Sequence, residues 1–485
     1  MKGFLQVTHI HGFEPGATAP PAPQRPDEEP EAAAPVGRMR VVNRTDVRPA
    51  SRLCRRMQGG PLAFRVAWQP VSDPSRQPAV NVGLRPRLAC KRPRILPSLG
   101  WARARCARLE PDPARLGRVR RTARSGSGYA HGGEKMIDLE TRSAAGLIAL
   151  TSLRGIGPAQ AERLAGRFAS LDELAETPPE RLRGIVTAAA AESLGRRAAL
   201  SEAASRARDV LEQADRLAVR ILSVHDPAYP NALRRLPDRP PVLYVKGSLD
   251  QVHRSVACIG TREPSEFGET VTRRITQRLV AADWTIVSGL AIGIDTLAHA
   301  TALEHGGRTV AVMAGGLDDV YPKQNRKLAE DILANSGALI SEQSFGVPPA
   351  GRHLVQRDRL QSGLSVATFV MQTDVKGGSM HTVRFTLLQD RLLFAPAPRG
   401  RHAEEPKSRG ILALTQLSGR ELAVLLRAEG EYERLLLRRH AASSVAIPLS
   451  GKGDYAMMLD TLEDQAARDA VAREDDAEGV QAAMI

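Results

Sequence analysis

The sequence is poor in aromatic residues and cysteine, and it has no long apolar stretch. Aromatic side chains make up 4% of its 485 residues, and its four cysteines form no CxxC pair or metal-ligand cluster. No apolar run approaches the roughly 18 residues of a membrane-spanning helix, and the N-terminus has no signal pattern. We therefore expect a soluble, cytoplasmic protein without a metal site.

Signature motifs of common enzyme classes are also missing. The GxGxxG dinucleotide fingerprint, the Walker A loop, the GxSxG elbow and metal-spaced groups of His, Asp and Glu are all absent. The length and the 42% hydrophobic content nevertheless suffice for two or three domains with at least one sizeable core. We expect a globular protein that is not an enzyme and uses no cofactor.

The positive charge lies almost entirely at one end of the chain. The formal net charge is +14, and residues 1–135 hold 25 Lys/Arg against 10 Asp/Glu, which leaves 43 against 44 for the rest. This segment is rich in Pro, Arg and Ala and lacks periodicity, so we expect it to be disordered. It is either a basic arm for a nucleic-acid backbone or sequence upstream of a true start at Met136, which "GGEK" precedes.

Three further regions follow from periodicity. Residues 136–217 are predicted to be helical, and "LRGIGPAQAERLAGRF" (153–168) is typical of a helix-hairpin-helix, although a plain pair of packed helices fits equally. Residues 218–400 begin with a bridge of short strands (218–250) and then alternate strands with helices. Residues 401–485 are predicted to be helical at 419–440 and 455–472, with an acidic end.

The alternating region predicts a doubly wound, Rossmann-like α/β domain. Its expected strands are apolar on both faces and separated by helices, which indicates a parallel sheet covered on both sides. They lie at 255–260, 285–290, 309–315, 338–343, 366–373 and 392–398.

Ligands of such sheets bind beyond the carboxyl ends of the strands, which selects four loops. These are 260–268, 288–295, 315–328 and 373–382, where "KGGS" can form a backbone nest over an anion. Together with 352–365 they are expected to gather a local basic patch, comprising Arg262, Lys323, Arg352, Arg357, Arg359 and Lys376.

The segment "TIVSGLAIGIDTLAHATALEHGG" (285–307) contains an Asp and a His four residues apart on an expected helix. Asp295 and His299 fit an acid–base pair, but a helix-capping Asp followed by a packed His is favoured, because carboxylates are stabilised at helix N-termini. We expect Gly289 and Gly293 to serve an anion and Asp295 to shape the turn.

Several stretches together resemble the DNA-processing protein A family (DprA, also called Smf) over roughly 145–400. They are "HDPAYPNALRRLPDRPPVLYVKGSLD", "VACIGTREPSEFG", "VSGLAIGIDTLAHATALEHGGRTVAVMAGGLDDVYPKQNRKLAEDI" and "RDRLQSGLS". The resemblance implies a Rossmann-like domain after a helix-hairpin-helix or SAM-like domain. It also implies a non-catalytic homodimer that binds single-stranded DNA, protects it and loads the RecA recombinase in natural transformation.

Carried over by position, the resemblance assigns phosphate contacts to loop and helix residues at the carboxyl edge. They are Arg262, Ser288, Gly289, Lys323, Asn325, Arg357, Arg359, Gly377, Gly378 and Ser379. The chain departs from the family in two places. "RDR" replaces the usual "RNR", so that Asp358 stands between two arginines, and "MQTDVKGGSMHTV" replaces "VEA...SGSLITA". The family's C-terminal winged helix is not recognisable in 405–485.

A second hypothesis keeps the fold and changes the function. The related lysine-decarboxylase-like phosphoribohydrolases share this fold, and a nucleotide sensor or a nucleotide-cleaving enzyme would fit the same sheet. Their "PGGxGTxxE" signature is absent, and "KGGSMHT" supplies no catalytic Glu. A partner-binding scaffold is the third alternative. Under the DNA-binding hypothesis, Trp284 and Tyr321 are the only nearby stacking candidates, so few base contacts are expected.

Overall fold

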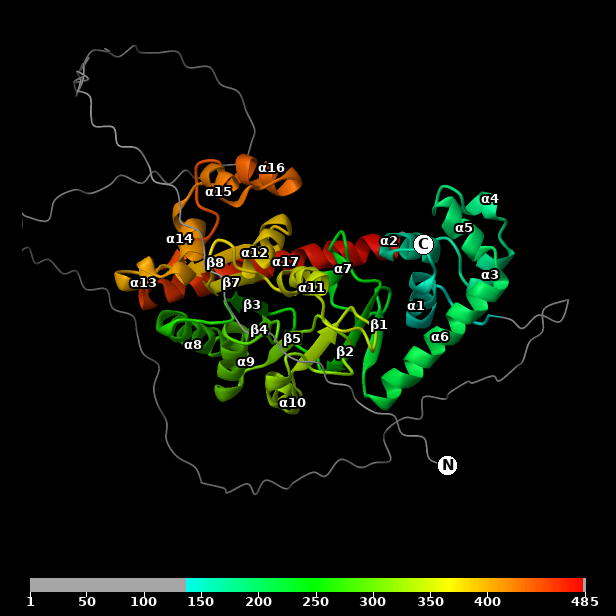
Figure 1. Cartoon of the computed structure of the whole chain (residues 1–485), viewed down its shortest axis with the longest axis horizontal. Helices are drawn as coiled ribbons and strands as arrows, with labels where there is room; N and C mark the ends of the chain where they lie inside the picture. The colour runs from blue at the N-terminus through cyan, green and yellow to red at the C-terminus, as the bar shows by residue number, and fades with distance from the viewer. Residues whose placement is uncertain (1–136, 483–485) are drawn as a thin grey trace, which may run out of the picture. The chain divides into compact units, whose positions relative to one another are not determined.

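The computed structural model describes residues 137–482, while 1–136 and 483–485 lie outside that range (Figure 1). The predictions of a basic arm and of a start at Met136 fall outside the described residues. Within that range, no helix is long and apolar enough to cross a membrane.

Six helices precede the sheet. They are α1 (Ala144–Ser152), α2 (Pro158–Ala165), α3 (Leu171–Glu176), α4 (Pro179–Leu182), α5 (Ala188–Leu194) and α6 (Arg197–Arg216). Local chemistry sets their ends: the Ser143 hydroxyl accepts the Gly146 amide at the start of α1, and Pro158 occupies the first turn of α2. Between α1 and α2, Gly155 has a φ of +82°, which only glycine adopts readily.

Nine strands form one sheet in the order β1-β2-β6-β5-β4-β3-β7-β8-β9. All neighbours from β6 to β9 pair in parallel, whereas β1 and β2 add an antiparallel edge. The predicted doubly wound α/β fold is therefore confirmed, with a mixed edge built from the expected bridge. The strands are β1 (Arg220–Ser223), β2 (Val242–Gly247), β3 (Ser255–Gly260), β4 (Thr285–Ser288), β5 (Thr309–Val312), β6 (Ala338–Ser341), β7 (Ala367–Gln372), β8 (Leu392–Pro396) and β9 (Ile447–Leu449).

Helices cover both faces of the sheet, because successive strand residues are buried on opposite sides. Val256 and Cys258 of β3 join a core with α8 and α9, whereas Ile259 faces a second core with α12. Figure 1 shows α8 to α10 on one side of the strands and α11 and α12 on the other. The helices here are α7 (Asn231–Arg234), α8 (Glu266–Val280), α9 (Ile294–Glu304), α10 (Arg326–Ala334), α11 (Gly351–Leu364) and α12 (Ser379–Leu388).

The chain beyond residue 400 is built into the same sheet, which the expected boundary there did not anticipate. Strand β9 pairs with β8, and Met458 and Leu462 of α17 are buried in the core under α8. Three-residue β9 is too short to carry a periodicity signal, so the sequence pattern missed it. The remaining helices are α13 (Arg401–Glu404), α14 (Arg409–Gln416), α15 (Gly419–Leu426), α16 (Gly430–Arg439) and α17 (Tyr455–Ala482).

The strand order creates a switch point beside β3. The chain proceeds from β3 through β4 and β5 to β6 in one direction and then returns through α11 to place β7 on the other side of β3. At such a reversal the connecting segments diverge, which leaves a crevice at the carboxyl ends of the strands.

The packing of α17 gives a stability prediction. Leu462 is fully buried, so Leu462→Ala should lower the free energy of unfolding by about 2–5 kcal/mol. Val471 lies on the same helix and is 60% exposed, so Val471→Ala should change it by less than about 0.5 kcal/mol. Urea unfolding monitored by circular dichroism measures both. Equal small effects would show that α17 is not part of the core.

Candidate functional site

Two cavities lie at the switch point. The first has a volume of about 490 Å³ and is bounded by the loops after β4, β5 and β6. The second has a volume of about 400 Å³ and is bounded by the loops after β3 and β7 and by α11. Arg262 and Arg357 line both cavities, so we refer to the two together as the cleft.

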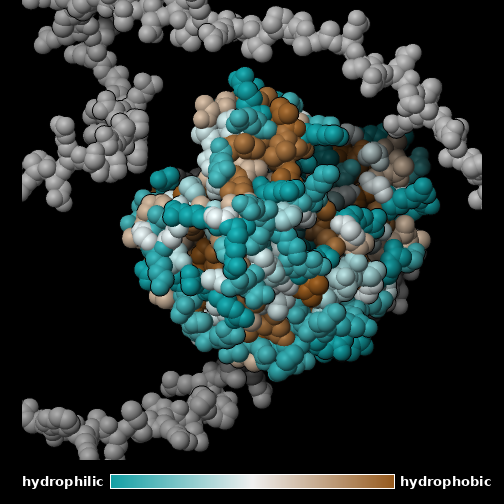
Figure 2. Space-filling view, turned by 60° about the vertical axis from the view of Figure 1, so that its left-hand side comes forward, coloured by the Kyte–Doolittle hydropathy of each residue, from teal (hydrophilic) through white to brown (hydrophobic). Residues whose placement is uncertain are grey.

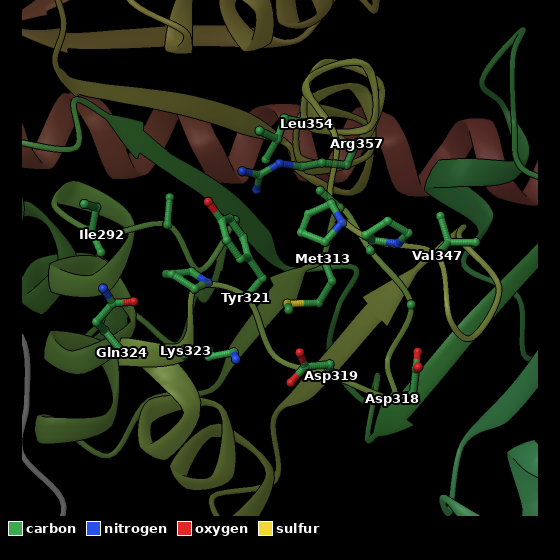
Figure 3. Close-up of a pocket in the computed structure, with 18 of the residues that line it drawn as sticks. Ile292, Met313, Asp318, Asp319, Tyr321, Lys323, Gln324, Val347, Leu354 and Arg357 are labelled. Carbon is green, nitrogen blue, oxygen red and sulfur yellow. The ribbon is translucent and has the colours of Figure 1, made fainter. Parts of the chain in front are cut away.

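Arg357 is held at the centre of the cleft by backbone and by a neighbouring carboxylate. Its Nη1 donates to the Val312 carbonyl at 3.2 Å, and its Nε lies 3.1 Å from Asp358 Oδ1. The side chain is only 7% exposed. Figure 3 shows it reaching from α11 into the first cavity, opposite Tyr321 and Met313.

The two glycines of the β4–α9 turn make room for the side chain of Arg357 and for the backbone at Arg262. A Cβ on Gly289 would lie 1.3 Å from Arg357 Nη1, so only glycine admits the guanidinium there. Gly293 has a φ of +87°, and its Cβ would lie 2.5 Å from the Arg262 carbonyl. Both glycines thus have a packing role beside Arg357 and Arg262, and Gly289 also lines the first cavity.

Asp295 shapes the turn, as the sequence predicts. Its Oδ2 accepts the amides of Gly289 at 3.1 Å and Ala291 at 3.3 Å. Burial raises the pKa of this carboxyl, and Arg357 opposes the shift.

His299 belongs to the core. Its Nδ1 lies 2.6 Å from the Thr309 hydroxyl, which donates to the Ile286 carbonyl, so Nδ1 carries the proton. Burial lowers the pKa of the imidazole to about 3, so the ring is neutral at physiological pH. It lines neither cavity, which argues against an acid–base pair with Asp295.

Several predicted contacts do line the cleft. Arg262 and Lys323 are exposed, and neither side chain forms a hydrogen bond or ion pair among residues 137–471, whose side chains are described, so both cations can contact a ligand. Gly377, Gly378 and Ser379 border the second cavity where α12 begins, and no side chain caps that helix.

Three other predicted contacts are placed differently. Ser288 is fully buried and donates to the Cys258 carbonyl at 2.6 Å. Asn325 is buried as well, and its Nδ2 donates to the Leu290 carbonyl at 2.7 Å, which fixes the turn that carries Lys323. Arg359 lines neither cavity, and its Nη2 and Nε pair with two carboxylates, Glu342 at 2.6 Å and Asp238 at 2.9 Å. Arg352 and Lys376 border neither cavity.

The second cavity has a polar wall that the motifs did not reveal. Lys407 borders it and donates to the Glu263 carbonyl at 2.6 Å, and Gln361 Nε2 donates to Asp358 Oδ1 at 3.0 Å. Lys407 follows β8 without any motif, so no sequence signal could have placed it here. Among the described residues, no group of three or more His, Cys, Asp or Glu could hold a metal ion.

Asp358 is the unusual titratable group of the cleft. Burial raises the pKa of its carboxyl to about 7, against the attraction of Arg357. One guanidinium faces two buried carboxylates, Asp358 and Asp295, and the repulsion between the two adds to the shift.

The segment that forms this cleft is similar to a known protein family. The model of the DNA recombination-mediator protein A family matches residues 220–423, which contain the cleft-forming loops and α11. The Smf protein of Synechocystis is 36% identical over 258 residues, and DprA of Bacillus subtilis is 36% identical over 179 residues. Over these segments the chain is similar to proteins of the DprA/Smf family.

The match with these DprA/Smf relatives is partial. The aligned segments cover 51% and 36% of this chain and 63% and 60% of the two relatives, which is less than two-thirds of their length. A solved structure of DprA from Streptococcus pneumoniae is 27% identical with a TM-score of 0.45, covering 57% of this chain and 98% of that one. One of Helicobacter pylori DprA, described for its single-stranded DNA binding mode, is 28% identical with a TM-score of 0.36, covering 45% and 94%.

The pKa of Asp358 predicts a pH dependence of stability. Between pH 4 and 7 the folded chain retains a proton that the unfolded chain releases, so the free energy of unfolding falls as pH rises, by up to about 1.4 kcal/mol per unit. Asp358→Asn should flatten this dependence and stabilise the protein above pH 7. Urea unfolding from pH 4 to 8 measures it. The exposed Glu269→Gln is the control, and parallel curves for the two variants would contradict the assignment.

Proposed function

We propose that the cleft binds the backbone of single-stranded DNA without catalysis. The observation that carries the proposal is the meeting of two unpaired cations, Arg262 and Lys323, with the buried guanidinium of Arg357 at the switch point. Cations that track phosphates, with few base contacts, are typical of proteins that bind single strands without sequence preference.

The second cavity supplies further phosphate contacts in this proposal. Gly377, Gly378 and Ser379 stand at the uncapped start of α12, where backbone N–H groups and the helix dipole favour an anion. Arg359, Ser288 and Asn325 act indirectly, since their side chains are occupied by protein partners.

The similarity to this family supports a biological role. We propose that the chain acts in DNA uptake and recombination, protects single strands and presents them to the RecA recombinase. The homologous DprA of Bacillus subtilis is named a DNA processing protein, and the matching family model is that of a recombination mediator. The same resemblance supports a cytoplasmic homodimer.

An exposed apolar surface supports self-association. Val424 is 77% exposed, Leu425 45% and Leu437 41%, all on the adjacent helices α15 and α16. Figure 2 shows apolar residues gathered on the part of the surface that projects at the top, where Figure 1 places these helices. Apolar side chains grouped in this way commonly mark protein contacts.

One observation favours a second candidate function. The first cavity combines Tyr321, which is 49% exposed, with Met313 and Ile292, and its volume of about 490 Å³ is typical of small-molecule sites. A nucleotide sensor or a nucleotide-cleaving enzyme would place a base against Tyr321 and a phosphate against Arg357.

The phosphate contacts are tested by charge removal. Arg262→Ala and Lys323→Ala should each weaken oligo-dT binding by the full chain and lower the slope of log affinity against log salt by about 0.7. Fluorescence anisotropy across a salt series measures this. Lys327→Ala removes an exposed charge that Asp331 pairs at 2.8 Å, and it should leave the slope unchanged. Slopes equal to that of this control would rule out phosphate contacts by Arg262 and Lys323.

The position of Arg357 is tested without removing any charge. In Gly289→Ala the new Cβ overlaps the guanidinium, which must swing away, so oligo-dT affinity should fall about tenfold while the net charge stays the same. Circular dichroism establishes that the variant is folded. Native affinity in a folded variant would show that the observed position of Arg357 is not needed.

A further inference from the structure

A third cavity lies along the same edge of the sheet, outside the cleft. Its volume is about 460 Å³, and its walls come from α8, the segments after β8 and β9, and the start of α17. Part of this wall, including Lys452 and Tyr455, lies beyond residue 423, where the family match ends.

The third cavity has an excess of unpaired positive charge. Arg274, Arg399 and Lys452 border it, are exposed, and form no ion pair with the side chains described in residues 137–471. Its single acidic lining residue, Glu266, is paired with Arg401 at 3.1 Å. Because its one acidic residue is neutralised by an ion pair, the cavity presents three positive charges that can attract a polyanion.

Aromatic rings stand among these cations. The Phe267 ring stacks on the His402 imidazole, with centroids 5.4 Å apart and planes 25° apart. Tyr455, at the start of α17, is half-buried, and burial raises its pKa against the opposing effect of the nearby Arg274 guanidinium. Rings interleaved with cations are the chemistry that binds bases together with their phosphates.

The third cavity continues the cleft along the sheet. The carboxyl ends of β3 and β7 border the second cavity, and those of β8 and β9 border the third. These four strands are parallel neighbours, so they span about 14 Å at roughly 4.8 Å per step. One short segment joins the two, since Arg399 and His402 border the third cavity and Lys407 the second.

We propose that the third cavity binds a further stretch of the same DNA strand that occupies the cleft. This proposal rests on the function proposed above. A continuous strand is favoured over a separate nucleotide, because the three cations come from three different elements and the cavity lies at the same edge of the sheet as the cleft. The C-terminal part of this chain thereby lengthens the DNA path beyond residues 220–423, the segment that the family model matches.

The test compares two triple variants that lose the same charge. The cavity variant removes the three cations of the third cavity and carries Arg274→Ala, Arg399→Ala and Lys452→Ala. The control variant removes three exposed cations elsewhere and carries Arg278→Ala, Arg420→Ala and Arg434→Ala. Both are made in the full chain, so residues 1–135 contribute equally. Binding of oligo-dT of about 30 and about 6 nucleotides is measured across a salt series.

The cavity variant should bind the long strand at least tenfold more weakly than the control variant, with a salt slope lower by about 2, and the short strand equally well. Equal salt slopes for the two variants on the long strand would show that the third cavity does not bind DNA. Equal losses of affinity for the long and the short strand would show that the third cavity is not a site separate from the cleft. In both cases the native chain still binds DNA, so the proposed function stands. Absence of DNA binding by the native chain would instead refute the proposed function and this inference with it.

Discussion

The cleft depends on the contact between the Arg357 guanidinium and the bare backbone of Gly289. That contact brings a cation from α11 against the turn after β4, directly above the buried carboxylate of Asp295. Asp358 balances the guanidinium from its own helix at 3.1 Å. One positive charge thus faces two buried acids, and the exposed Arg262 and Lys323 line the cleft beside it.

The rest of the architecture serves this arrangement. The reversal of strand order beside β3 opens the crevice, and Asn325 and Ser288 fasten the loops that form its rim. Some polar residues of these loops therefore hydrogen-bond to the backbone, whereas others line the cavities. In residues 401–485, β9 and α17 extend the sheet and its core, and they bring Lys452 and Tyr455 to the same edge.

The sequence predicted the fold well and the site in part. Strands buried on both faces identified the parallel sheet, and the rule for carboxyl ends placed Arg262, Lys323 and Gly377 at its edge. The sequence could not show which of Arg357 and Arg359 faces the cleft. The two residues lie two positions apart on one helix, so their side chains point about half a turn apart. Arg359 forms ion pairs with Glu342 and Asp238, which are distant in sequence. The sequence also did not predict the position of Lys407 or the strand β9, since neither belongs to a motif or a periodic run.

The most direct test of the account is the binding of a fluorescent oligo-dT strand to the full chain, with free nucleotides and a duplex as competitors. The account predicts affinity that falls linearly with log salt, with little displacement by free nucleotides or by duplex. Displacement of the strand by a mononucleotide, or failure to bind DNA together with binding of a free nucleotide, would contradict it and identify the cleft as a nucleotide site.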